Sequence, residues 1–330
     1  MSQESKWDYD KTRKSLLKKP VRDINLSSVI TLYDLYLQLK NTGGFTATKV
    51  AEAVDILSEM IMKKDVTRFL SFPACIIATG TRGVIKELIK RKMFDVVITT
   101  TGTLDHDLAR IWQKYFHGSF MMDDIMLRKL EINRLGNVLV PNESYGIILE
   151  KKLQPILSNI YESGLRELST YELIWEIGKR IDNEESIIYW ATKNKIPMIV
   201  PGITDGAVGY QIWLFHQTHK DFKINILKDE DLLNDIIWES KNTGALIIGG
   251  GISKHHTIWW NQFKEGLKYA VYITTAPEWD GSLSGARTRE AISWGKLSES
   301  AKHVTVEGDA TILLPIIISA LLSKMEMNKS

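Results

Sequence analysis

The sequence predicts an α/β fold of the Rossmann-like, doubly wound type, with a mainly parallel sheet and helices on both faces. Short apolar and β-branched runs alternate with helix-length segments from residue 74 to the C-terminus. Apolar residues are nearly continuous within these runs, which is typical of parallel strands that are buried on both faces. Glycine and small polar residues follow most of the runs, and ligands of open parallel sheets bind at that end of the strands. One compact domain fits this pattern better than two.

Composition limits the class of protein. The chain has 330 residues, of which 44% are hydrophobic and 25% are charged, as in ordinary globular proteins. The net charge of +2 gives no electrostatic reason to expect nucleic acid or a membrane as a partner. The one cysteine, Cys75, excludes an intramolecular disulfide and a multi-cysteine zinc site, and it favours a reducing, cytoplasmic setting. We expect a polar N-terminal arm over residues 1–26 and a single domain over residues 27–330.

The elements follow from local signals. Ser27 or Ser28 is expected to cap a helix that runs to about Lys40, and a second helix is expected after Thr46. Seven runs are predicted to be strands: Ala74–Ala78, Asp95–Thr101, Pro197–Val200, Lys223–Ile226, Gly244–Ile248, Tyr269–Ile273 and His303–Val306. Further helices are predicted from near Asp105, over Ile147–Tyr161, over Ser169–Ile181 and from Asp309.

Two of these helices carry additional expectations. Ser169 and Glu172 have the spacing of a capping box. The C-terminal helix contains the longest apolar run, Thr311–Leu322, which is interrupted by Pro315. A run of about a dozen residues is too short to span a bilayer, so a buried helix is expected there.

Glycines gather where the predicted strands end, as in Gly249-Gly250-Gly251 after the run ALII. Backbone without side chains lets a pyrophosphate or a sugar approach the main chain closely. None of these loops fits the G-x-G-x-x-G pattern of ordinary dehydrogenases. Dinucleotide binding by a variant of the fold is therefore one hypothesis, and plain turn formation is the alternative.

The stretch Asp280–Lys296 holds the strongest candidate for covalent chemistry. Trp294 and Lys296 lie two residues apart, and an aromatic neighbour that excludes water favours the neutral amine that Schiff-base chemistry needs. An ordinary solvated lysine is the alternative interpretation.

Histidines give weaker signals. His255 and His256 are adjacent, so they do not share a helix face, form a poor metal site and place at most one ring in a crevice. That ring is either structural or a general base. His106 lies in a cluster that is typical of helix capping. We expect no metal.

Several motifs, in family order over roughly residues 43–322, resemble deoxyhypusine synthase. The matching pieces are GGF-x-AT at 43–48, DVVITTTG at 95–102, TDGAVG at 204–209, IIGGGISKHH at 247–256, YAVYITTA at 269–276, DGSLSGARTREAISWGK at 280–296 and GDATILLP at 308–315. The combination of GGG-x-x-KHH with SGAR-x-x-EA-x-SWGK makes the resemblance specific.

The resemblance implies an NAD-dependent aminobutyl transferase that works as a homotetramer, with active sites at a dimer interface. NAD oxidises spermidine, and the four-carbon unit is then held as an imine on an enzyme lysine. The unit passes to one lysine of the hypusine-containing translation factor, where the retained NADH reduces the new imine. Residues 27–330 would thus form one NAD-binding catalytic domain, with spermidine or a related polyamine and the translation factor as partners.

The resemblance also implies roles for individual residues. Lys296 would carry the imine, and His255 would be the base beside the amine that is oxidised. The substrate would be held by Glu290, Trp294, Asp105, Gly281 and Ser282. The cofactor would be held by Thr100, Gly102, Asp205, Gly250, Thr275, Asp280, Asp309 and Ala310.

The sequence departs from the family pattern at several of these sites. Ala74–Ala78 replaces the loop SNLIS on the NAD side, and His106 replaces an acid. Tyr210 and Leu283 stand where the family has carboxylates, and Trp259 stands where it has an asparagine. A different donor amine, such as agmatine or homospermidine, is therefore an alternative.

Other functions are also open at this point. These are a homospermidine-synthase-like transfer to a small amine and a non-catalytic NAD-binding regulatory paralogue. A sirtuin-like deacylase has a related nucleotide fold, but one cysteine cannot build its zinc ribbon.

Overall fold

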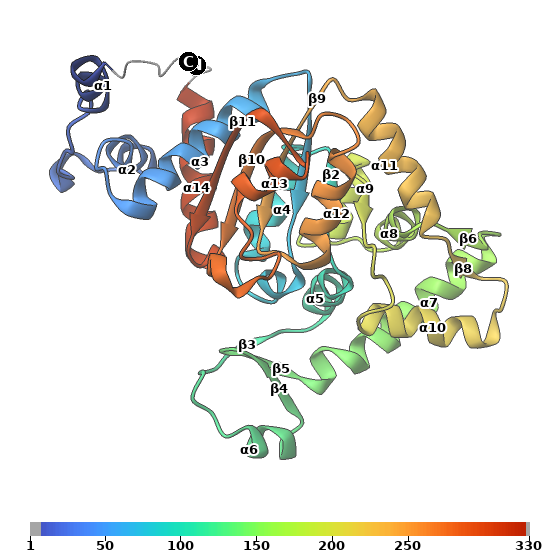
Figure 1. Cartoon of the computed structure of the whole chain (residues 1–330). Coiled ribbons are helices and arrows are strands. Elements are labelled where there is room, and N and C mark those ends of the chain that lie inside the picture. Colours follow the sequence, from blue (N-terminus) through green and yellow to red (C-terminus); the bar gives the residue numbers. More distant parts are fainter. Residues whose placement is uncertain (1–7, 328–330) are drawn as a thin grey trace.

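A central parallel sheet organises the molecule, as the computed structural model of the chain shows for residues 8–327 (Figure 1). Its six strands follow the order β11-β10-β9-β1-β2-β7, and every neighbouring pair is parallel. The strands are β1 (Val66–Ser71), β2 (Val96–Ile98), β7 (Met198–Ile199), β9 (Asn242–Ile248), β10 (Leu267–Thr274) and β11 (Leu297–Glu307). The predicted α/β class is thereby confirmed.

Helices cover both faces of this sheet (Figure 1). Adjacent strand residues such as Leu246 and Ile247 belong to different core clusters, because successive side chains point to opposite faces. The core on one face is shared by residues of α2 (Leu32–Leu39), α3 (Phe45–Met62), α4 (Arg82–Lys90), α5 (Thr101–Trp112), α7 (Gly146–Glu162), α8 (Thr170–Gly178), α9 (Ile187–Asn194), α10 (Ala207–Thr218) and α14 (Ala310–Met327), some of which pack on other helices rather than on the sheet. The other packs against α11 (Leu227–Glu239), α12 (Gly251–Asn261) and α13 (Thr288–Ser293).

Two small sheets lie outside the central one. An antiparallel sheet is formed by β3 (Phe116–His117), β4 (Ile132–Leu135) and β5 (Val138–Pro141), and it projects from the body together with α6 (Asp124–Lys129) (Figure 1). A parallel pair joins β6 (Glu167–Leu168) to β8 (Lys223–Ile224). The strand predicted at Lys223–Ile226 therefore exists in shortened form and does not belong to the central sheet.

Several predicted boundaries are wrong. Ala74–Ala78 is the short 3-10 helix η2 and not a strand, because its apolar residues Ile76 and Ile77 reach the core without ladder pairing. Helix α5 begins at Thr101 and not near Asp105, so Gly102 lies inside the helix. Ser27 and Ser28 form the 3-10 turn η1 (Leu26–Ser28).

Capping chemistry explains two of the helix starts. Thr31, and not either serine, caps α2 through a capping box with Asp34. The capping box predicted for Ser169 and Glu172 is present at the start of α8. The remaining short 3-10 helices are η3 (Asn142–Ser144) and η4 (Glu278–Asp280).

Helix α14 is longer than its apolar run suggested. It continues through Pro315 and, by length and composition alone, could cross a membrane. The expectation that the apolar segment is too short to span a bilayer was therefore wrong. One stripe of the helix, which includes Leu314, Ile317 and Leu321, is buried and packs toward α3 and α2. Core helices of globular proteins also meet the same length and composition criteria.

The N-terminal arm is only partly described, because residues 1–7 lie outside the described part of the chain. Helix α1 (Tyr9–Leu16) buries none of its residues. The division into an arm of residues 1–26 and one domain of residues 27–330 stays a prediction.

A buried ion pair connects α4, α5 and α9. The guanidinium of Arg82 donates to Asp107 over 2.8 Å, and the Asp107 side chain is fully buried. The same carboxylate accepts from the Ser186 hydroxyl and from the Ile187 and Ile188 amides at the start of α9. Asp107 therefore neutralises a buried cation and also caps a helix.

We expect Asp107→Ala to lower the free energy of unfolding by about 3–5 kcal/mol, because it leaves a buried guanidinium without its counter-charge. Urea denaturation followed by circular dichroism measures this difference. Glu87→Ala is the matched control: it removes an exposed pair with Arg91 on α4, and it should cost less than about 1 kcal/mol. Equal losses for the two variants would contradict the interpretation.

Candidate active site

The carboxyl ends of β9, β10 and β11 meet at one edge of the sheet. Ile248 pairs with Ile273, and Thr274 pairs with Glu307, so the three strands end almost level. Two cavities lie at this edge, and the loop of residues 280–286 contributes to both. This register explains why motifs far apart in the sequence come together.

The first cavity, here called the lysine pocket, has a volume of about 300 Å³. It is lined by Lys254, His255, Ile258, Trp259, Tyr272, Leu283, Ala286, Arg287, Glu290, Ala291, Trp294 and Lys296. The structure thus brings together four of the predicted residues, namely Lys296, His255, Glu290 and Trp294.

Lys296 lies near two indole rings. Its Nζ is 5.1 Å from the ring centroid of Trp294 and 5.9 Å from that of Trp259. The lysine is buried, whereas Trp294 is exposed and forms an outer wall. Gly295 adopts a positive φ of 67°, which turns the chain between α13 and Lys296. An amine held this way can react inside the pocket while its approach stays open.

Lys254 holds the loop that forms one wall of the pocket. Its Nζ donates to the carbonyl oxygens of Leu283 and Ala286, each at 2.7 Å, and lies 4.2 Å from the ring centroid of Tyr272. Burial lowers the pKa of Lys254 to about 8, although the nearby charge of Glu290 opposes this shift. No local sequence pattern indicates a role for this lysine, because its partners are backbone atoms about thirty residues away.

The two adjacent histidines have different surroundings. His255 lines the lysine pocket and stacks on Trp259, with ring centroids 5.6 Å apart. Burial, and then the charge of Lys296, hold the pKa of His255 below its usual value, which favours the neutral imidazole. His256 instead faces Glu230, with Nε2 3.2 Å from the carboxylate. The prediction that only one of the two rings reaches the crevice is confirmed.

Glu290 is the only carboxylate among the residues that line the lysine pocket. Within residues 8–327 no salt bridge involves it, so its charge is available to a cationic ligand. Leu283 and Trp259 also line the pocket, at the two positions where the sequence departs from the family pattern. Apolar and aromatic walls with one carboxylate suit a carbon chain that ends in an ammonium group.

Asp105 lies outside the lysine pocket of this protomer. Its carboxylate accepts from the Ala207 and Val208 amides at 2.9 and 2.7 Å, and from the Tyr145 hydroxyl. Burial raises the pKa of Asp105 above its usual range. The structure gives this residue a capping role at the start of α10, and its predicted contact with substrate has no geometric support in the described chain.

Other predicted residues also have local roles. His106 lies inside α5, where it bonds the Tyr115 hydroxyl rather than capping a helix, and burial lowers its pKa to about 4. Gly281 occupies the left-handed turn after η4, and Ser282 donates its amide to Asp280. Neither Gly281 nor Ser282 lines the lysine pocket.

The second cavity, here called the strand-end cavity, has a volume of about 380 Å³. It is lined by Pro73, Cys75, Ile76, Ile248, Gly249, Ile273, Thr274, Thr275, Ala276, Asp280, Ser282, Ser284, Gly308, Asp309 and Ala310. Four of the predicted cofactor residues are among them: Thr275, Asp280, Asp309 and Ala310.

The other predicted cofactor residues lie outside the lining of this cavity. The Thr100 hydroxyl accepts from the Ala74 amide and fixes the start of η2, and Gly102 lies against the Ala74 side chain. Gly250 lies against Ser284 in the shared loop. Asp205 is exposed in the turn that follows β7. Their cofactor roles stay predictions.

The lining of the strand-end cavity fits a nucleotide cofactor. Gly249 has a φ of 68° and Gly308 a φ of 153°, so backbone without side chains faces the space at two strand ends. Asp280 and Asp309 supply carboxylates that can accept from ribose hydroxyls. The amides after the strands suit a diphosphate.

Gly250→Ala should disturb both cavities, because an added Cβ would lie 2.2 Å from the Ser284 Oγ and 2.5 Å from its Cα. The loop of residues 280–286 must then move. We expect NAD to bind at least about tenfold more weakly, a loss of about 1.4 kcal/mol.

Fluorescence titration with NAD measures this change. Gly83→Ala in α4 is the control, because nothing lies within 4 Å of its added Cβ. Unchanged NAD affinity in a folded Gly250→Ala variant would show that the loop does not form the cofactor wall.

Comparison with known proteins agrees with this geometry. The profile of the deoxyhypusine synthase family matches residues 34–321. A protein of Picrophilus torridus named as a probable deoxyhypusine synthase is 58% identical over 310 residues, which cover 94% of this chain and 99% of that protein. A protein of the same name from Thermoplasma volcanium is 57% identical with the same coverage.

A solved structure agrees at the level of the fold. It is assigned to a deoxyhypusine synthase of Entamoeba histolytica and superposes with a TM-score of 0.66 at 20% identity. The alignment covers 92% of this chain and 97% of that one.

Proposed function

The chain belongs to the deoxyhypusine synthase family, and we propose that its lysine pocket carries out the family's aminobutyl transfer on Lys296. The reaction moves the aminobutyl group of spermidine to a lysine of the hypusine-containing translation factor, and the enzyme is an NAD-dependent aminobutyl transferase. The presence of Lys296 in one pocket with Glu290 and His255 is the observation that supports the residue assignments.

NAD, when bound, accepts a hydride from the carbon beside the donor amine and returns it at the end of the reaction. Thr275, Asp280, Asp309 and Ala310 would hold it in the strand-end cavity, whose lining fits a nucleotide. The loop of residues 280–286 forms part of the wall of both cavities, so the cofactor and the donor amine would lie on either side of it.

Lys296 acts as the nucleophile. Its Nζ adds to the carbon of the donor imine, 1,3-diaminopropane leaves with the original nitrogen, and a new imine joins the four-carbon unit to Lys296. The lysine of the protein substrate then displaces Lys296 by the same exchange. The indoles of Trp294 and Trp259 shield part of the enzyme imine from water, which slows its hydrolysis.

His255 and Glu290 prepare the donor. His255 takes the proton of the donor's internal ammonium, because the lowered pKa keeps its imidazole neutral. Glu290 attracts the terminal ammonium of the aminobutyl unit. Leu283 and Trp259 replace polar groups with apolar surface, so the rest of the donor must find its counter-charges elsewhere. We propose that these come from a second subunit of a homotetramer, with the site at a dimer interface.

The cellular setting is part of the same proposal. A single cysteine and a protein substrate that takes part in translation both support a cytoplasmic location.

Replacement of Lys296 tests the proposal directly. Lys296→Ala should retain NAD binding but lose transfer by at least about 10³-fold, because the covalent route is closed. Transfer is followed as radiolabel from spermidine appearing in the translation factor. Lys302→Ala is the control, because that lysine is exposed on the other side of β11 and pairs with Glu59. Transfer at the wild-type rate by Lys296→Ala would remove the assignment.

The acceptor is tested in the same assay. Addition of putrescine in place of the translation factor distinguishes protein modification from transfer to a small amine. A product formed faster with putrescine would support the homospermidine-synthase-like alternative.

His255 gives a pH dependence of defined sign. A neutral base is present above its pKa and is lost as pH falls through it, so kcat/KM should decline on the acid side. Because burial lowers the pKa of His255, this inflection should lie below pH 6.5. We expect His255→Gln to remove the inflection and to lower kcat by about 10²–10⁴-fold. An unchanged acid limb in the variant would assign the base to another group.

A further inference from the structure

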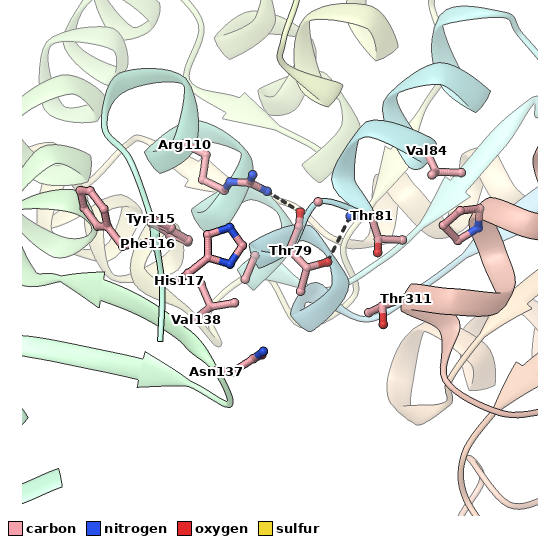
Figure 2. A pocket seen from close by; sticks show the side chains of 13 residues that line it. Thr79, Thr81, Val84, Arg110, Tyr115, Phe116, His117, Asn137, Val138 and Thr311 are labelled. Atoms are coloured by element: carbon pink, nitrogen blue, oxygen red, sulfur yellow. Dashed lines mark hydrogen bonds between the residues drawn. The ribbon is translucent and has the colours of Figure 1, made fainter. Parts of the chain in front are cut away.

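A third cavity, whose lining side chains are drawn in Figure 2, shares no lining residue with the strand-end cavity. We call it the arginine cavity; its volume is about 450 Å³. It is enclosed by the turn before α4, the end of α5, the paired strands β3 and β5, and the start of α14. It is lined by Ala78, Thr79, Gly80, Thr81, Val84, Arg110, Tyr115, Phe116, His117, Asn137, Val138, Thr311 and Pro315.

Arg110 brings a positive charge into this cavity without an ionic partner. Its Nη1 donates to the carbonyl oxygens of Ile77 and Thr79, at 2.7 and 2.6 Å, which fixes the guanidinium. Within residues 8–327 no salt bridge joins Arg110 to a carboxylate, and its Nε and Nη2 make no hydrogen bond. Asp107, the acid whose charge reaches Arg110, is held by Arg82.

The electrostatics of the cavity favour an anion. No Asp or Glu among residues 8–327 lines it, and the polar groups of its lining are hydroxyl, amide, imidazole and guanidinium. Burial and the neighbouring Arg82 lower the pKa of Arg110, so the charged form lacks the solvation that water would give. An anionic ligand would supply that missing stabilisation.

Thr81 adds an independent observation. The residue is only 5% exposed, and its hydroxyl makes no hydrogen bond to any of residues 8–327. Thr81 is the N-cap residue of α4, yet its side chain does not cap the helix as threonines in that position usually do. The hydroxyl of this threonine is therefore available as a hydrogen-bond donor to a ligand, and the residue lines the cavity.

We propose that the arginine cavity binds a phosphorylated small molecule, with the phosphate held by the free Nε and Nη2 of Arg110 and by the Thr81 hydroxyl. Val84, Phe116 and Pro315 supply apolar surface for the carbon skeleton of the ligand. The volume exceeds that of a single phosphate and is within the range of small-molecule pockets. The site is separate from the lysine pocket and does not depend on the proposed transfer reaction.

Inorganic phosphate is the probe. Its binding to the full chain is measured by isothermal titration calorimetry with NAD at saturation, so that the diphosphate-binding groups of the strand-end cavity are already occupied. We expect saturable binding, weakened at least about tenfold by Arg110→Gln and at least about threefold by Thr81→Val, because each removes a donor to the anion.

Arg128→Gln is the matched control, because it removes an equal charge from the exposed end of α6 and should leave phosphate affinity unchanged. Thermal melting establishes that each variant is folded. Thr81→Val decides the outcome if Arg110→Gln does not fold. The proposal is overturned if wild-type protein shows no saturable phosphate binding, or if folded Thr81→Val binds phosphate with wild-type affinity.

Discussion

The buried ammonium of Lys254 is the constraint on which both pockets of the candidate active site depend. It bonds two carbonyl oxygens of the loop of residues 280–286, and this loop is a wall of the lysine pocket and of the strand-end cavity. If a turn alone held the loop, the loop could move and neither cavity would have a fixed shape. Two short bonds to a charged donor fix it instead, and bonds of this kind are about twice as strong as neutral ones. The cost is a desolvated lysine, which is why its pKa falls to about 8.

The division of labour between two lysines follows from their surroundings. Lys254 faces backbone carbonyls and the ring of Tyr272, so its nitrogen is occupied. Lys296 faces two indoles, and its nitrogen makes no hydrogen bond to a carbonyl oxygen of residues 8–327, so it is available to react. Both lysines line one pocket of the same small volume. Covalent catalysis requires an unoccupied amine such as that of Lys296, whereas positioning of the loop requires a hydrogen-bonded one such as that of Lys254.

Much of this could be predicted from the sequence, because it depends on patterns that are local. Continuous apolar strands and the glycines after them led to the parallel sheet and to its ligand-binding edge. The motif SWGK led to Lys296.

What the sequence could not show are contacts between distant segments. Nothing near Lys254 in the sequence distinguishes it from a surface lysine, because its partners are the carbonyl oxygens of Leu283 and Ala286. The contacts of the Asp105 carboxylate with the first amides of α10 likewise join distant segments, and the predicted role of Asp105 in substrate binding stays a prediction. The apolar run Ala74–Ala78 was predicted to be a strand, because a buried 3-10 turn and a buried strand have the same apolar composition.

The central claim is that Lys296, and not Lys254, carries the aminobutyl group. The most direct measurement is borohydride reduction of the enzyme in the presence of NAD and spermidine labelled in its aminobutyl carbons, followed by peptide mapping. Reduction converts an imine into a stable secondary amine, so the label marks the lysine that held it. The account predicts a single labelled peptide with the modification on Lys296. A label on Lys254, or on a peptide from outside the lysine pocket, would contradict it.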